Sequence, residues 1–214
     1  MFFKDRSDAG KRMADIVISS GLTGKWDVVG IARGGVVIAA EISKALNVGI
    51  KSICVEEAEI SKKSIIAVSS LGSGILFQEG LRSDFIPIVG ELNGKIAMET
   101  AIKAREKQLK LAGRDNDYGK RILLCDDGVV SGRTLITAVR SLMANGALEI
   151  IAVIPVILPW VANQKEFRVI SWRTTKMTNP TTGVFYYDFR DVPDEDVMLM
   201  LKEHQGKMFF GETA

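Results

Sequence analysis

The sequence predicts an α/β fold in which a parallel sheet is covered by helices on both faces. Short apolar segments of strand length alternate along the chain with longer segments that have the pattern of helices. Each strand-like segment is apolar throughout, as is typical of strands buried on both sides. With 214 residues the chain is long enough for one sizeable core, and we expect a single domain.

The N-terminal part of the chain predicts a helix, a strand–turn–helix unit and a second strand. Residues 8–19 carry apolar side chains at helical spacing. The apolar run 26–32 stops at the glycine turn 33–35, and 36–46 again has the pattern of a helix. A second short strand is expected at 50–55.

Residues 56–94 interrupt this alternation, because they are richer in Ser, Gly and Lys and their apolar pattern is weak. Strand candidates within them are 65–69 and 75–77. We expect the segment to be a flexible excursion from a core that spans about residues 8–156.

The C-terminal part returns to regular elements. A helix rich in strong helix formers is expected over 93–112, closed by Gly113. The core is completed by a strand at 121–125, a helix ending near residue 144 and a strand at 149–156. Residues 157–214 contain prolines and an aromatic cluster, and we expect them to form a C-terminal cap, or hood, on the same domain, which would span 1–214.

Composition narrows the class of protein. Hydrophobic content of 47% and charged content of 25% are ordinary for a globular protein, and a net charge of +2 indicates neither a nucleic-acid nor a membrane partner. The first residues do not resemble a secretory signal, and no charge-free apolar run could span a bilayer, so we expect a cytoplasmic location. Cys54 and Cys125 lie in apolar segments and should behave as small hydrophobic residues, and with one His a zinc site is not expected.

Two adjacent carboxylates, Asp126 and Asp127, follow the strand 121–125, at the end of a strand where open parallel sheets bind ligands. The next segment, 128–134, offers backbone N–H groups, two hydroxyls and the start of a helix, which together suit an anion. Carboxylates repel phosphate but suit sugar hydroxyls or Mg²⁺. A phosphorylated sugar satisfies both halves of this arrangement.

The motif is neither a Walker loop, which needs Gly-Lys-Ser/Thr at its end, nor a dinucleotide fingerprint, which needs G-x-G-x-x-G directly after the strand. Its order, four apolar residues, an acidic pair and Ser-Gly-x-Thr, resembles the phosphoribosyl-diphosphate (PRPP) signature of type I phosphoribosyltransferases. The turn IARGGV is similar to the diphosphate-binding loop of that superfamily, which often contains a non-proline cis peptide, here the Ala32–Arg33 bond. The start FKDRSDAGKRMA, the helix with KARE and the end FYYDFRDVPDEDV resemble a stand-alone bacterial subfamily of predicted phosphoribosyltransferases.

The resemblance implies roles for individual residues. Asp126 and Asp127 would be the catalytic pair, binding the ribose hydroxyls and Mg²⁺ through water. The 5′-phosphate would be held by Gly128, Val129, Val130, Ser131, Gly132, Arg133 and Thr134. The diphosphate would be held by Ala32, Arg33, Gly34 and Gly35. In the hood, Phe185, Tyr186 and Asp188 could contact the base, although aromatic clusters more often belong to a core.

The implied activity is a magnesium-dependent transfer of the 5-phosphoribosyl group of PRPP to a nitrogenous, nucleobase-like acceptor with release of diphosphate. A PRPP-binding regulator or sensor without turnover, and a hydrolase or phosphorylase-like use of the same pocket, stay open as alternatives. A homo-oligomer, most commonly a dimer, is expected for the fold class.

Two single residues and one acidic segment depart from the pattern of the family. Val130 stands where oxopurine-type members have an aspartate. Arg133 replaces a frequent glycine and could either contact phosphate or point to solvent. The acidic residues Glu56, Glu57 and Glu59 occupy a segment expected to be basic, where they would oppose PRPP if they faced the site, and Lys62 and Lys63 either substitute from a closing loop or are simply solvated.

Overall fold

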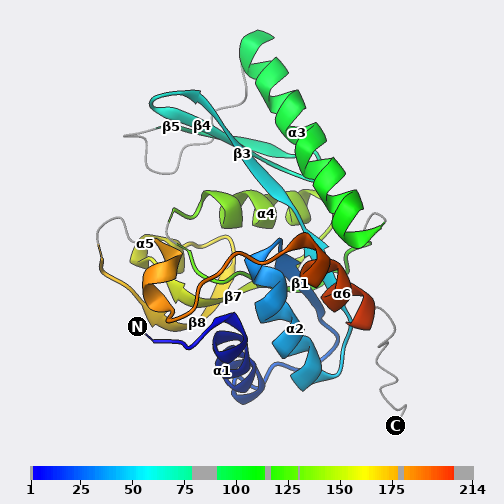
Figure 1. Ribbon diagram of the computed structural model, residues 1–214, viewed down its shortest axis with the longest axis vertical. Coiled ribbons are helices and arrows are strands. Elements are labelled where there is room, and N and C mark those ends of the chain that lie inside the picture. Colours follow the sequence, from blue (N-terminus) through cyan, green and yellow to red (C-terminus); the bar gives the residue numbers. More distant parts are fainter. Residues whose placement is uncertain (1, 79–90, 114–116, 130, 178–180, 205–214) are drawn as a thin grey trace.

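The computed structural model describes residues 2–78, 91–113, 117–129, 131–177 and 181–204, and Figure 1 shows their arrangement in layers. The central layer is a five-stranded sheet of order β2-β1-β6-β7-β8 in which every neighbouring pair is parallel. Its strands are β1 (Asp27–Ile31), β2 (Ile50–Ile53), β6 (Arg121–Cys125), β7 (Glu149–Ile157) and β8 (Arg168–Thr174). The predicted parallel α/β fold is confirmed.

Helices cover both faces of this sheet. On one face, α1 (Arg6–Ser19), α2 (Gly34–Leu46) and α6 (Asp194–His204) share a core cluster with side chains of the strands. On the opposite face, α4 (Arg133–Ala144) and the short α5 (Pro159–Ala162) share a second cluster, in which Leu124 and Leu142 are fully buried. Because side chains alternate along each strand, neighbouring residues of the apolar runs enter different clusters.

A second sheet lies on the outer side of α4 (Figure 1). Its antiparallel strands are β3 (Val55–Ser61), β4 (Ser64–Ser69) and β5 (Gly74–Gln78), and we call them the arm. On one face of β4, Ile66 and Val68 pack against α3 (Glu91–Ala112), whereas Ala67 on the other face joins the α4 cluster. The arm is therefore packed between two helices.

The predicted strands at 65–69 and 75–77 are confirmed as β4 and β5, but β3 was not expected. The sequence prediction extended the second strand to residue 55, whereas the chain leaves the main sheet after Ile53 and starts β3 at Val55. In addition, β8 comes from the segment expected to cap the core, and it forms the edge of the main sheet beside β7. The hood also contains the 3₁₀ turn η1 (Thr182–Phe185).

Cys54 and Cys125 are buried free thiols, as expected. Burial raises the pKa of Cys54 to about 12, so this thiol stays protonated. Among the described residues, no helix is long and apolar enough to cross a membrane.

Candidate active site

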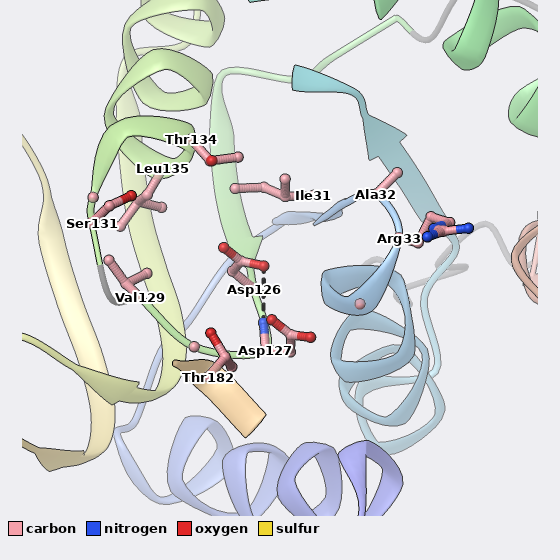
Figure 2. A pocket seen from close by; sticks show the side chains of 13 residues that line it. Ile31, Ala32, Arg33, Asp126, Asp127, Val129, Ser131, Thr134, Leu135 and Thr182 are labelled. Atoms are coloured by element: carbon pink, nitrogen blue, oxygen red, sulfur yellow. Dashed lines mark hydrogen bonds between the residues drawn. The ribbon is translucent and has the colours of Figure 1, made fainter. Parts of the chain in front are cut away.

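A cavity of about 280 Å³ opens at the carboxyl ends of β1 and β6 (Figure 2). It is lined by most of the predicted site residues, namely Ala32, Arg33, Gly34, Asp126, Asp127, Gly128, Val129, Ser131, Gly132 and Thr134. Ile31, Leu135 and Thr182 line it as well and were not predicted. Parallel pairing of β1 with β6 brings the two sequence motifs together, since both follow the same ends of adjacent strands.

The two carboxylates differ in their surroundings. The backbone N–H of Asp127 donates to Asp126 Oδ1 at 3.0 Å, and Asp127 Oδ2 lies 2.6 Å from Arg6 Nε. Burial, and then the neighbouring Asp127 carboxylate, raise the pKa of Asp126 well above its usual range. Burial also raises the pKa of Asp127, but there the hydrogen bond and charge of Arg6 oppose the rise. Asp127 therefore has stronger support for its negative charge than Asp126 has.

Arg6, at the start of α1, is held from three sides. Its Nη1 donates to the backbone oxygen of Arg190 at 2.6 Å, and its guanidinium lies 3.7 Å from the centre of the Phe189 ring. Its side chain is 12% exposed and that of Asp127 is 14% exposed, so water screens the pair little. The sequence analysis did not assign Arg6 to the site, although the N-terminal stretch that contains it contributed to the family resemblance.

The hood contacts the site differently from what was expected. Phe185 and Tyr186 are 2% and 1% exposed and belong to the core, where Phe2 and Phe3 pack against them. Asp188 pairs with Arg190 and does not line the cavity. These three hood residues therefore do not line the cavity in this structure, and the two aromatic rings bury apolar area in the core instead, as the core alternative expected.

Two hood residues do reach the carboxylate motif. The hydroxyl of Tyr186 donates to the backbone oxygen of Asp127, and Thr182 lines the cavity beside Gly128. No sequence signal pointed to Thr182, which begins the short 3₁₀ turn η1. The hood thus holds the backbone of the carboxylate motif in place through Tyr186.

The loop 128–134 leads directly into the first turn of α4. Gly132, at the N-cap of α4, has a φ of 76°, a left-handed conformation that side chains rarely adopt, and an added Cβ would lie 2.8 Å from Trp160. Ser131 and Thr134 line the cavity on this side (Figure 2). Val130 lies outside the described residues.

The turn 32–35 lies opposite this loop. The predicted cis peptide between Ala32 and Arg33 is confirmed. An added Cβ on Gly34 would lie 2.0 Å from Asp127 Oδ2, and one on Gly35 would lie 2.4 Å from the backbone oxygen of Cys125. Both glycines are thus required by close approach of the two motifs. Gly35 does not line the cavity, and the Arg33 side chain points away from the carboxylates, with Nη1 3.7 Å from Asp194 Oδ1 (Figure 2).

Arg133 does not line the cavity, and its side chain is paired with a carboxylate and does not point freely to solvent. Its Nε and Nη2 donate to Glu57 Oε2 at 3.0 and 2.8 Å. The hydroxyl of Thr134 donates to the other carboxylate oxygen of Glu57 at 3.1 Å. A residue of the arm is therefore bound to the first turn of α4.

The remaining charged residues of the arm lie away from the cavity. Glu56 pairs with Lys107 of α3, and Glu59 is exposed. Lys62 and Lys63 form the exposed turn between β3 and β4, which agrees with the solvated alternative.

Comparison with known proteins agrees with this architecture. The sequence profile of the phosphoribosyl transferase domain matches residues 4–185. Proteins of two Mycobacterium tuberculosis strains, named as candidate phosphoribosyl transferases, are 26% identical over 165 residues, which cover 72% of this chain and 35% of theirs. The chain thus spans about a third of the length of these relatives.

A solved structure shares the fold across nearly the whole chain. The structure of the Thermus thermophilus protein TT1426 matches with a TM-score of 0.75 at 23% sequence identity, covering 95% of this chain and 99% of that one. The profile match covers most of the sequence, including the carboxylate pair, the loop 128–134 and the turn 32–35. The chain belongs to the phosphoribosyl transferase domain family.

Proposed function

We propose that this protein is a magnesium-dependent phosphoribosyltransferase that moves the 5-phosphoribosyl group of PRPP to a nitrogenous, nucleobase-like acceptor and releases diphosphate. The observation that carries the proposal is the cavity itself. One hollow is lined by an acidic pair, by an anion-binding loop at a helix start and by a glycine turn. These three surfaces match the three chemically distinct parts of PRPP: the ribose hydroxyls, the 5′-phosphate and the diphosphate.

The 5′-phosphate would bind in the loop 128–134. Backbone N–H groups at the start of α4 and the hydroxyls of Ser131 and Thr134 are donors, and the positive end of the helix dipole favours a dianion. The ribose would then lie over Asp126 and Asp127, whose oxygens accept hydrogen bonds from its hydroxyls.

The diphosphate would bind at the turn 32–35, which is also the start of α2. With two glycines at this point, backbone N–H groups can approach the phosphate oxygens closely. Arg33 has a partner in Asp194, and 39% of its side chain is exposed, so its guanidinium could exchange that partner for the diphosphate.

The donor set suits magnesium. Asp126 and Asp127 offer hard oxygen atoms, and magnesium is usually bound through one or two carboxylates together with substrate phosphates. Magnesium, when bound, would neutralise charge that builds up on the leaving diphosphate. Asp127 is held by Arg6, so Asp126 Oδ2 is the oxygen better placed for such a role.

In the proposed reaction, the bond between the ribose C1 and the diphosphate oxygen breaks, and the oxygen keeps the electron pair. A nitrogen of the acceptor supplies the electron pair of the new bond to C1, and its proton leaves to solvent or to the diphosphate. Positive charge develops on the ribose ring between these events. The carboxylates below the ring stabilise that charge, while the two anion-binding turns hold the ends of PRPP in place.

Titration with PRPP and Mg²⁺, followed by assays of diphosphate release with purine and pyrimidine bases, tests the proposal. Binding together with base-dependent diphosphate release is expected. Absence of PRPP binding would overturn it. Tight binding without turnover on any base would favour the alternative of a PRPP-binding regulator or sensor.

A further inference from the structure

The carboxylate of Glu57 is an anion that already contacts the loop of the proposed 5′-phosphate subsite. Its carboxylate accepts two hydrogen bonds from Arg133 and one from the Thr134 hydroxyl, at 2.8 to 3.1 Å. Both donors belong to the first turn of α4, where the helix dipole favours negative charge. Glu57 is not among the residues that line the cavity, whereas Thr134 is, so Glu57 holds the Thr134 hydroxyl from outside.

The Thr134 hydroxyl has one proton and can donate one hydrogen bond. A phosphate oxygen needs that same proton, because a phosphate dianion only accepts hydrogen bonds. The hydroxyl can therefore serve Glu57 or the 5′-phosphate, but not both at once. Arg133 is less restricted, since only two of its five N–H donors are directed to Glu57 Oε2, but those two also serve Glu57 and not the ligand.

We propose that Glu57 is a resident competitor of the 5′-phosphate, and that it sets the affinity of this subsite for phosphorylated ligands. When a phosphate enters, the Thr134 hydroxyl transfers its hydrogen bond to the ligand, Arg133 becomes available to the same anion, and β3 loses this attachment to α4. This inference rests on the proposed function, because it takes the loop 128–134 as the phosphate subsite.

The alternative is that Glu57 supports the phosphate subsite and does not compete for it. If Glu57 instead held Thr134 and Arg133 in a geometry that phosphate needs, removing its carboxylate would weaken binding. The two roles therefore predict changes of opposite sign in PRPP affinity. Side-chain exposures of 28% for Glu57 and 31% for Arg133 mean that the contact is accessible to water and can be exchanged at modest cost.

The arm offers two matched controls. Glu56→Gln breaks the attachment of β3 to Lys107 of α3, and so tests whether any loosening of the arm changes affinity. Glu59→Gln removes an exposed charge two residues along the same strand, and so tests the effect of net charge alone.

The experiment is calorimetric titration of the full chain and its variants with PRPP in the presence of Mg²⁺. We expect Glu57→Gln and Glu57→Ala to bind about five- to tenfold more tightly than the wild type, and both controls to stay within about twofold of it. Either Glu57 variant suffices if the other fails to fold. Unchanged or weaker binding by the Glu57 variants, or an equal gain in a control, overturns the competitor role while the proposed function stands. Failure of the wild type and of every variant to bind PRPP overturns the proposed function as well.

Discussion

Asp126 and Asp127 are adjacent in sequence, but the fold gives them different chemistry. Asp127 faces a guanidinium at 2.6 Å, which in turn is fixed by an aromatic ring and a backbone oxygen of the hood. Asp126 has a backbone N–H as its hydrogen-bond donor and a second carboxylate as its neighbour, and its pKa is raised by burial and by that neighbour. Arg6 thus decides which of the two acids keeps its charge more easily.

Replacement of Arg6 by alanine should therefore affect both stability and binding. It leaves a largely buried carboxylate unpaired, which should lower the free energy of unfolding by about 3 kcal/mol. It also removes the cause that opposes the rise of the Asp127 pKa, so PRPP binding with Mg²⁺ should weaken at pH 6 more than at pH 8. Denaturant unfolding and titrations at several pH values measure the two effects.

Arg12→Ala is the matched control for Arg6. Arg12 lies on the same helix, pairs with Asp8 and is placed over an aromatic ring, Phe3, but its side chain is 44% exposed. An exposed pair of this kind contributes less than about 1 kcal/mol. Equal losses of binding in the two variants would show that Arg6 acts through the packing of α1 and not through Asp127.

Asp126 should make the stability of the ligand-free protein depend on pH. Its pKa in the folded chain is raised above the ordinary value of 3.8, so the folded state binds its proton more tightly than the unfolded state does. This contribution is fully present below about pH 3.8 and is lost as the pH rises through the raised pKa. Asp126→Asn should therefore increase the thermal midpoint at pH 7 by a few degrees, and the difference from the wild type should shrink toward pH 4. A difference that is constant over this range would contradict the prediction.

Among the elements, the turn between β1 and α2 is packed directly against the carboxylate motif. An alanine methyl at Gly34 would collide with Asp127 Oδ2, 2.0 Å away, and would lie 3.0 Å from Arg6 Nε. Gly34→Ala should displace Asp127 from Arg6 and weaken PRPP binding by more than about tenfold, since an interaction with an ionised group is lost at the site. Titration with PRPP and Mg²⁺ measures the loss.

Gly94→Ala provides the comparison. Gly94 lies in α3, where, beyond the helix's own turn, no atom of the described residues lies within 4 Å of an added Cβ, and alanine favours a helix by up to about 1 kcal/mol over glycine. This variant should bind PRPP like the wild type and be equally or more stable. If both glycine variants bind equally well, the close approach at Gly34 is not important for the site.

The elements that could be predicted from sequence were those whose signal is local. The strand β6 is a run of apolar residues that ends at charged ones, and its predicted bounds agree with the structure. By contrast, β3 contains three glutamates in seven residues, and it is a strand because it pairs with β4 and is held by Lys107 and Arg133. Such partners are distant in sequence, so no local pattern reveals them.

The site shows the same difference between local motifs and contacts that are distant in sequence. The carboxylate pair and the two glycine-containing turns are contiguous motifs, so the sequence alone predicts them as parts of the site. Arg6, Thr182 and Glu57 reach the site only through the docking of α1, the hood and the arm. Their roles depend on tertiary packing, which the sequence of each segment does not report.

At the scale of the whole molecule, the site connects parts of the chain that are far apart in sequence. Arg6 joins Asp127 to the start of the chain, Tyr186 joins it to the hood, and Glu57 joins the adjoining loop to the arm. A ligand that filled the cavity would contact the ends of β1 and β6 and Thr182 of the hood at once, because residues of all three line it. Binding should therefore stabilise the folded chain as a unit.

The stabilisation of the folded chain by PRPP can be measured by thermal unfolding. PRPP at one hundred times its dissociation constant, with Mg²⁺, should add about 2.7 kcal/mol to the free energy of unfolding. For a chain of this length, that corresponds to a rise in the thermal midpoint of about 5 to 10 °C. Because the carboxylates and the diphosphate would otherwise repel each other, chelation of Mg²⁺ with EDTA should remove most of the rise. An equal rise with and without EDTA would contradict the prediction. It would mean that the acidic pair binds only the ribose hydroxyls of PRPP, and that the metal has no part in recognition.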